Sequence, residues 1–307
     1  MSLKAGVIGA GAFGRHHARK YSEDQRVTLT GVFDPDSERA EMLAELHHVR
    51  AFETPEALVA ACDVVTIASP PTTHAAMARL ALDAGKHTLI EKPLAVDPID
   101  GADLVARAAA RSVVLAVGHQ ERLVLEAIGL LDVPERPTLI EATRAGPWSG
   151  RSADVSVTMD LMIHDVDVAL ALIGEAATSW DARGKRTQGA VADELRAEAR
   201  FASGAEAHFF ASRIAEERAR SMRLVYPSGE VRVDFVAKTF ENETPFALDP
   251  QFMDRPDAQD SLGANVRRFI DVILGERERV PATGNDGLAA LQLAHKFDQA
   301  FLAARAA

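Results

Sequence analysis

Glu91-Lys92-Pro93 is a stretch of this sequence whose residue types could do chemistry, and it directly follows the strand-like apolar run 87–90. Proline fixes its own φ angle and restricts the residue before it, so Pro93 would aim the Lys92 side chain. A lysine in a partly desolvated cleft loses its proton more easily and can act as an acid or a base near neutral pH. An ordinary solvated loop lysine is the alternative that the location leaves open.

Asp160 and His164 form a second candidate pair, four positions apart in an apolar stretch that predicts a helix over 157–173. Residues four apart share one face of an α-helix, so both side chains could point across a cleft toward Lys92. The histidine could shuttle the proton of a reacting hydroxyl, and the aspartate could orient the site or bind the substrate. A buried structural histidine is the alternative.

Two more aspartates follow at once, in the run His-Asp-Val-Asp. Carboxylates and an imidazole on one helix could also hold a metal ion. The proton chemistry outlined above requires no metal, and the sequence shows no second cluster of His and Cys. We therefore expect no metal site.

The run Gly9-Ala10-Gly11-Ala12-Phe13-Gly14 follows a strand-like segment and precedes a helical pattern. In that context the first glycine permits a tight turn, the second lets the backbone approach a pyrophosphate, and the third allows close helix–strand packing. The free N–H groups of the helix N-terminus then favour the anion. A strand–turn–helix without ligand is the alternative.

Asp34 ends the second strand-like run, where the adenosine ribose of a dinucleotide would lie. Its carboxylate would accept hydrogen bonds from both ribose hydroxyls and would repel a 2′-phosphate. NAD is therefore favoured over NADP. Arg39, about one helical turn later, is the residue that could reverse this preference.

Near-continuous apolar runs alternate with helical patterns over the first 118 residues, as expected for a doubly wound parallel sheet. Ligands lie at the carboxyl ends of such strands, so Ser69-Pro70 and Lys92 should stand side by side. Thr72 or Thr73 could cap the helix that carries His74. The helices are predicted over 13–21, 36–47, 55–61, 72–84 and 98–111.

The pattern changes after Gly118. A helix over 121–131 and a strand over 138–144 precede the apolar helix, and several alternating strands separated by turn signals occupy 176–240. A loop over 241–250 and helices over 257–274 and 285–304 complete the chain. We expect a Rossmann domain over 1–119 and an α+β domain with a predominantly antiparallel sheet over 120–307.

Bulk properties exclude several classes of function. The net charge is −11 and no block of basic residues occurs, which argues against nucleic acid or an anionic membrane as partner. No apolar run is long enough for a membrane span. The glycine motif begins at once, leaving no room for a signal peptide, and the single cysteine, Cys62, fits a reducing cytoplasm.

Taken together, the glycine fingerprint, Ser69-Pro70-Pro71-x-x-His74, Glu91-Lys92-Pro93 and Asp160-x-x-x-His164 resemble the Gfo/Idh/MocA oxidoreductases over essentially the whole chain. Within the family, the combination of residues 118–122 with residues 159–167 is more similar to a subgroup resembling UDP-N-acetylglucosamine 3-dehydrogenases than to inositol dehydrogenases. The resemblance implies that Lys92 and His164 are catalytic, with Asp160 beside them. It implies cofactor contacts from Gly9, Gly11, Ala12, Phe13, Gly14, Asp34, Ser69, Pro70, His74, Glu91, Lys92 and Gln120, and substrate contacts from Lys92, Arg122, Arg144, Asp160 and His164.

The expected reaction is hydride transfer between a sugar or nucleotide-sugar hydroxyl carbon and NAD. Arg144, Arg151 and Arg213 are candidates for a diphosphate by charge and position, while Arg122 could instead form an interdomain ion pair. A redox-neutral NAD-dependent glycosidase or lyase, and a non-catalytic nucleotide sensor, stay open because fold does not fix function. We expect a homodimer or homotetramer through the C-terminal sheet, whose outer face otherwise needs cover.

Overall fold

The structure is a computed structural model that describes residues 2–148, 150, 154–187 and 191–306. The chain forms two compact units, one of Met1–Gln120 with Asp260–Leu288 and one of Glu121–Gln259 with Ala289–Ala307. The expected division at residues 119 and 120 therefore differs from these units in one segment, because residues 260–288 return to the first unit.

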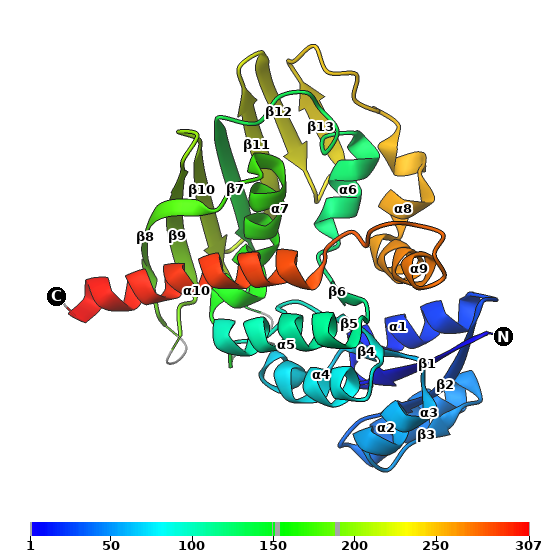
Figure 1. Ribbon diagram of the computed structural model, residues 1–307. Coiled ribbons are helices and arrows are strands. Elements are labelled where there is room, and N and C mark those ends of the chain that lie inside the picture. The colour runs from blue at the N-terminus through cyan, green and yellow to red at the C-terminus, as the bar shows by residue number, and fades with distance from the viewer. Residues whose placement is uncertain (1, 149, 151–153, 188–190, 307) are drawn as a thin grey trace. The chain divides into compact units, whose positions relative to one another are not determined.

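The first unit is built on a six-stranded sheet in the order β3-β2-β1-β4-β5-β6 (Figure 1). Every neighbouring pair is parallel, which confirms the predicted doubly wound sheet and matches the Rossmann strand order. The short β3 was not predicted from the sequence. The strands are β1 Leu3–Ile8, β2 Val27–Phe33, β3 Arg50–Ala51, β4 Val64–Ile67, β5 His87–Ile90 and β6 Leu115–Val117.

Local signals set the helix boundaries of this unit. Thr54 and Asp97 cap α3 and α5 by accepting hydrogen bonds from backbone amides of the first turn, and each helix has a proline at its first position. Both helices therefore have the predicted bounds. The helices are α1 Ala12–Glu23, α2 Ser37–His47, α3 Pro55–Ala61, α4 His74–Asp83, α5 Pro98–Arg111 and α9 Ser261–Ile273, with a 3₁₀ turn at Pro71–Thr73.

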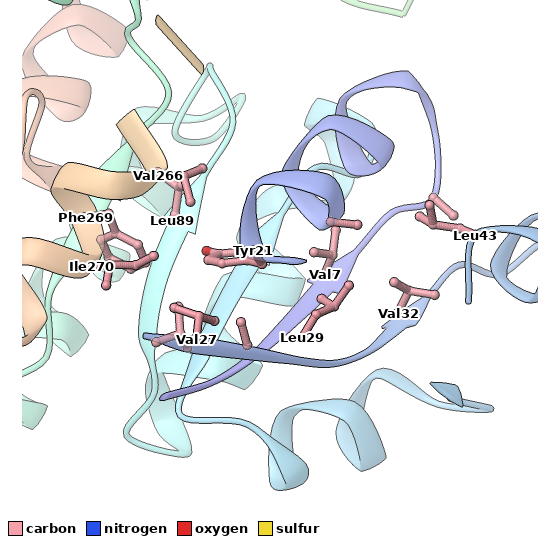
Figure 2. Packing of buried hydrophobic residues seen from close by; sticks show 14 of the residues in the cluster. Val7, Tyr21, Val27, Leu29, Val32, Leu43, Leu89, Val266, Phe269 and Ile270 are labelled. Atoms are coloured by element: carbon pink, nitrogen blue, oxygen red, sulfur yellow. The ribbon is translucent and has the colours of Figure 1, made fainter. Parts of the chain in front are cut away.

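The two faces of the six-stranded sheet are covered by different helices. Helices α3, α4 and α5 pack on one face, and α1, α2 and α9 on the other. Figure 2 shows Phe269 and Ile270 of α9 pointing toward Tyr21 of α1 and Val27 of β2. Tyr21 is fully buried, and its hydroxyl lies 2.6 Å from the hydroxyl oxygen of Thr66. The returning segment is thus part of the core of the first unit.

The second unit is built on a seven-stranded sheet in the order β13-β12-β11-β7-β10-β9-β8 (Figure 1). Only the pair β7 and β10 is parallel, so the predicted, predominantly antiparallel sheet is confirmed. The strands are β7 Leu139–Ala145, β8 Ala177–Lys185, β9 Glu194–Phe201, β10 Glu206–Ser212, β11 Ala219–Tyr226, β12 Gly229–Asp234 and β13 Thr239–Asn242.

Helices cover the apolar face of this sheet. Phe209 of β10 packs against Phe297 of α10, with ring centroids 5.7 Å apart. The helices are α6 Glu121–Ile128, α7 Ile163–Ile173, α8 Pro256–Gln259 and α10 Gly284–Ala306, which begins in the first unit and continues in the second. None of the described helices combines the length and apolar character that a membrane span requires.

Several predicted elements have different bounds in the structure, and some of the differences have a clear local cause. The helix predicted over 157–173 begins with a π-helical turn, Thr158–Met162, before α7, because the amide of Ile163 donates to the carbonyl of Thr158. The helix predicted over 257–274 is interrupted at Asp260, whose carboxylate accepts from Gly263 N and caps α9. The loop predicted over 241–250 starts inside β13.

Candidate active site

The glycine loop has the geometry of a dinucleotide cradle. Gly9 has a φ angle of +102°, and a Cβ there would lie 2.7 Å from the backbone nitrogen of Ser69. A Cβ on Gly14 would overlap the carbonyl oxygen of Gly9. A Cβ on Gly11 would meet no atom within 4 Å, so this glycine borders open space at the start of α1. Helix geometry leaves the first amides of α1 without an intrahelical acceptor, and these groups fit a diphosphate.

Asp34 ties the end of β2 to this loop. Its Oδ2 accepts from Ala10 N at 2.7 Å and its Oδ1 from Asp36 N at 3.0 Å. Each carboxylate oxygen can accept a second hydrogen bond, so capacity for ribose hydroxyls remains. Arg39, the residue that could favour NADP, forms an exposed ion pair with Asp36 at 3.0 Å.

The loop after β4 is organised by hydroxyl groups. Thr73 Oγ1 donates to the carbonyl of Pro70 at 2.7 Å and lies 2.7 Å from Ser69 Oγ. Because the Thr73 proton is used on Pro70, Ser69 donates to Thr73. The Thr73 side chain makes no capping hydrogen bond to α4, so its predicted role as a helix cap is wrong.

His74 joins two loops at the carboxyl edge of the sheet. Its Nδ1 lies 2.7 Å from the carbonyl oxygen of Pro93, and its Nε2 lies 2.9 Å from that of Ser69. The loops after β4 and β5 therefore stand side by side, as the sequence predicts. Burial lowers the pKa of His74, although both carbonyl acceptors favour the charged ring. The cofactor contact expected of this residue stays a prediction.

Lys92 lies between two anchored neighbours. On one side, the buried Glu91 accepts a hydrogen bond from His17 Nε2 of α1 at 2.7 Å. On the other, Pro93 is held by His74, and the peptide bond joining Lys92 to Pro93 is cis. Burial favours the protonated carboxyl, but the hydrogen bond from His17 and the charges of His17 and Lys92 hold the pKa of Glu91 below its usual value.

His17 was not predicted to belong to the site. The available signal is its place on the buried face of α1, with Gly14, Ala18 and Tyr21. A single histidine on such a face is typical of a core residue. The sequence around it gives no sign that its partner is Glu91, 74 positions away. Gln120 was assigned to the cofactor, and its side-chain oxygen accepts from Ser261 Oγ at 3.4 Å.

His164, the second candidate catalytic residue, begins a chain of charged groups in the second unit, half-buried at His164 and Glu121 and buried at Arg144 and Asp165. Its Nδ1 lies 2.7 Å from Glu121 Oε2. Glu121 Oε1 accepts from Arg144 Nη1 at 2.9 Å. Arg144 also forms a bidentate pair with Asp165, at 3.1 and 2.8 Å. Residues from α6, β7 and α7 are thus joined in the order His164–Glu121–Arg144–Asp165.

The charges in this chain control one another. Burial alone would raise the pKa of Glu121, but the positive charges of His164 and Arg144 hold it well below its usual value. Burial raises the pKa of Asp165 in spite of its pair with Arg144. The two carboxylates raise the pKa of Arg144 although its burial opposes the charge. Glu121 is therefore ionised at neutral pH.

Arg122, which the sequence analysis assigned to the substrate, pairs with Asp167 inside the second unit. Its Nε and Nη2 each lie 2.7 Å from one carboxylate oxygen of Asp167. Both side chains are buried. Arg213 is likewise buried, with its Nε 2.8 Å from Asp193 Oδ1. Arg151 lies outside the described residues. Arg122 and Arg213 are thus paired with carboxylates inside the second unit, and their proposed substrate contacts stay predictions.

Asp160 lies in the π-helical turn, and its backbone amide donates to the carbonyl of Ser156 at 2.9 Å. The four-residue spacing to His164 therefore crosses from a π-helical turn into α7. The α-helical spacing that was expected to place both residues on one helix face does not hold over this stretch. Among the described residues, no group of three or more His, Cys, Asp or Glu side chains is arranged to hold a metal.

Comparison with known proteins matches both units. Residues 3–119 match the family model described as "Oxidoreductase family, NAD-binding Rossmann fold", and residues 133–232 match the "GFO/IDH/MocA C-terminal domain". UDP-N-acetylglucosamine 3-dehydrogenase from Acidithiobacillus ferrooxidans is 40% identical over 239 residues, covering 77% of this chain and 75% of the relative. Inositol 2-dehydrogenase from Rhizobium meliloti is 29% identical over 324 residues, covering 96% and 95%.

Solved structures give the same assignment. The Acidithiobacillus ferrooxidans UDP-N-acetylglucosamine 3-dehydrogenase GnnA matches with a TM-score of 0.88 and 35% identity over 99% of both chains. Scyllo-inositol dehydrogenase from Lactobacillus casei, solved with NAD(H) and scyllo-inositol, has a TM-score of 0.81 and 22% identity over 98% of this chain and 97% of that one, which shows the shared fold. The chain belongs to the Gfo/Idh/MocA family of oxidoreductases and uses NAD as its cofactor.

Proposed function

We propose that this dehydrogenase oxidises a hydroxyl group of a nucleotide sugar, with UDP-N-acetylglucosamine as the first substrate to test. The observation that carries the proposal is the likeness to a UDP-N-acetylglucosamine 3-dehydrogenase, at 35% identity over 99% of both chains. Inositol dehydrogenases match at lower identity. A free sugar or a polyol is therefore the fallback substrate class.

The proposal assigns the hydroxyl proton to Lys92 and His164. Lys92 is suited to this role because Glu91 and Pro93, on either side, are each held by a buried histidine. A side chain whose backbone is fixed in this way can deliver or accept a proton at one position. Asp160 would orient the substrate. Bound NAD would accept the hydride from the carbon that carries the hydroxyl.

NAD is favoured over NADP because Asp34 would place a carboxylate beside the adenosine ribose. The loop contacts from Ala10 and Asp36 fix this group in place. A 2′-phosphate would meet its negative charge at close range. Arg39 is paired with Asp36, which supports the same preference.

The test is formation of NADH by the purified protein with NAD and UDP-N-acetylglucosamine, followed by absorbance. Lys92→Met should lower kcat by about 10²–10⁴-fold, because it removes a positioned proton-transfer group. Lys86→Met, which alters a lysine just before the opposite end of β5, is the matched control and should retain activity. Turnover of free sugars or polyols but not of the nucleotide sugar would overturn the substrate assignment. Full activity of Lys92→Met would overturn the role of Lys92.

We also propose that the chain forms a homodimer or homotetramer through the outer face of the seven-stranded sheet. That face alternates in charge: β9 exposes Arg196, Glu198 and Arg200, and Arg223 of β11 pairs with Glu141 of β7 at 2.6 Å. Such a face can be complementary to a second copy of itself. Light scattering coupled to size exclusion, at low and high salt, tests this. A monomer in both conditions would contradict it.

A further inference from the structure

The contact between His164 and Glu121 determines which ring nitrogen of the histidine carries a proton. A carboxylate can only accept hydrogen bonds, and Glu121 is ionised because His164 and Arg144 hold its pKa well below the usual value. His164 Nδ1 lies 2.7 Å from Glu121 Oε2. The Nδ1 atom must therefore carry the hydrogen in both the neutral and the charged ring. In the neutral ring, Nε2 is then the atom with the lone pair.

Arg144 fixes the position of the Glu121 carboxylate. Both residues are largely shielded from solvent, with side-chain exposures of 3% for Arg144 and 16% for Glu121. Asp165 holds the other edge of the same guanidinium through two hydrogen bonds. The arginine thus lies between two carboxylates, and rotation of Glu121 away from His164 would break its ion pair with the buried Arg144.

The charges around His164 come from several elements. Arg220 of β11 lies opposite Arg144 in the sheet register, and its pKa is lowered by burial and by the charge of Arg144. The charge of Arg220 also acts on Asp165, where it favours the ionised carboxylate. The titratable groups to consider are Glu121 of α6, Arg144 of β7, Asp160 of the π-helical turn, Asp165 of α7 and Arg220 of β11.

We propose that Glu121 is a positioning residue that holds His164 in the tautomer protonated on Nδ1 and so makes Nε2 the proton-accepting atom. This inference rests on the catalytic role of His164 in the proposed function. In the proposed reaction Lys92 and His164 share the transfer of the hydroxyl proton; where the proton reaches His164 it binds Nε2, and the resulting imidazolium keeps its Nδ1–H donated to Glu121. The oxidant is the NAD of the proposed reaction. The role of Glu121 parallels that of any acidic group which orients a catalytic base.

The first experiment measures the tautomer itself and needs no substrate. The full-length protein is labelled with ¹⁵N-histidine, and the His164 signals are identified by their loss in His164→Gln among the ten histidines of the chain. The expected spectrum shows neutral His164 protonated on Nδ1, the tautomer that free histidine disfavours. A neutral ring protonated on Nε2 in the wild-type protein would overturn the proposal, whether or not any substrate is turned over.

The second experiment is the pH dependence of kcat/KM for wild type, Glu121→Gln, Glu121→Asp and the control Glu141→Gln. Glu141 is an exposed carboxylate of β7, also paired with an arginine. Glu121→Gln should lower kcat/KM by about 10²–10⁴-fold and move its acid limb to lower pH, because the charged ring loses its carboxylate. Glu121→Asp should recover part of the rate, and Glu141→Gln should match wild type.

The two experiments separate failure of this inference from failure of the proposed function. If the wild-type protein oxidises no sugar or nucleotide sugar, the proposed function fails, and the tautomer measurement still decides the role of Glu121. If Glu121→Gln only loses thermal stability, with an unchanged acid limb and an unchanged His164 spectrum, Glu121 is structural and the inference is wrong.

Discussion

Replacing Asp167 by Asn tests whether Arg122 serves the fold or the substrate. The Arg122 and Asp167 side chains are 7% and 1% exposed and share two hydrogen bonds of 2.7 Å. Asp167→Asn keeps the shape of the side chain but removes the carboxylate charge that is paired with the buried guanidinium. Removing one partner of a buried pair lowers the free energy of unfolding by about 3–5 kcal/mol. We expect a loss of that size.

Urea unfolding followed by tryptophan fluorescence is the appropriate assay. The chain has two tryptophans, Trp148 and Trp180, and both belong to the second unit, so the signal reports on the unit that contains the pair. The control is Glu141→Gln, which breaks an exposed pair with Arg223 and should cost only about 0–1 kcal/mol. The double variant Arg122→Met with Asp167→Leu should recover most of the loss, because it removes both charges.

A free energy of unfolding for Asp167→Asn within about 1 kcal/mol of wild type, as expected for an exposed pair, would contradict a structural role of Arg122. So would a variant that kept full stability but raised the KM of the substrate. The second result would return Arg122 to the substrate-binding role that the sequence suggests. A large loss of stability with an unchanged KM would establish the structural role.

Two further predictions follow from the glycine loop and from a buried acid. Gly14→Ala should lower both the melting temperature and the NAD affinity measured by calorimetry, because its Cβ would overlap Gly9 O. Gly11→Ala should lose only NAD affinity. A normal melting temperature for Gly14→Ala would contradict this. Burial raises the pKa of Asp298 above its ordinary value of 3.8, so the folded protein holds this proton more tightly than the unfolded chain. The free energy of unfolding then falls as the pH rises above 3.8 through the folded-state pKa of Asp298. Asp298→Asn, whose side-chain oxygen can still accept from Ser156 Oγ, should remove this fall. A difference in unfolding free energy between variant and wild type that does not change with pH would contradict this prediction.

Elements with strong local signals were predictable from the sequence. α3 and α5 have the predicted bounds because a capping residue and a proline mark each start. The parallel sheet was predictable because strands buried on both faces read as continuous apolar runs, as β4 does with four buried residues. The glycine loop, Asp34 and the Glu91-Lys92-Pro93 turn were found in the same way, through residue types that local geometry requires.

The features that were missed depend on partners far apart in the sequence. From the sequence, Arg144 and Arg122 were interpreted as charges available to a ligand. The residues next to them in the sequence do not indicate the buried carboxylates with which they pair. Glu121 lies in a stretch that the sequence analysis singled out, yet its contact with His164 spans 43 positions. The π-helical turn was missed because one extra residue in a turn leaves the apolar pattern of the helix almost unchanged.

The return of residues 260–288 to the first unit has a consequence for the order of events during synthesis. Val266, Phe269 and Ile270 complete a core that also contains Tyr21 and Leu89 (Figure 2). A nascent chain that has emerged only as far as Gln120 therefore carries every strand of the six-stranded sheet but exposes the apolar surface that α9 later covers. The ribosome must make all of Glu121–Gln259 before that surface can be closed. Residues 1–120 of this enzyme therefore keep an incompletely covered apolar core until α9 has been synthesised.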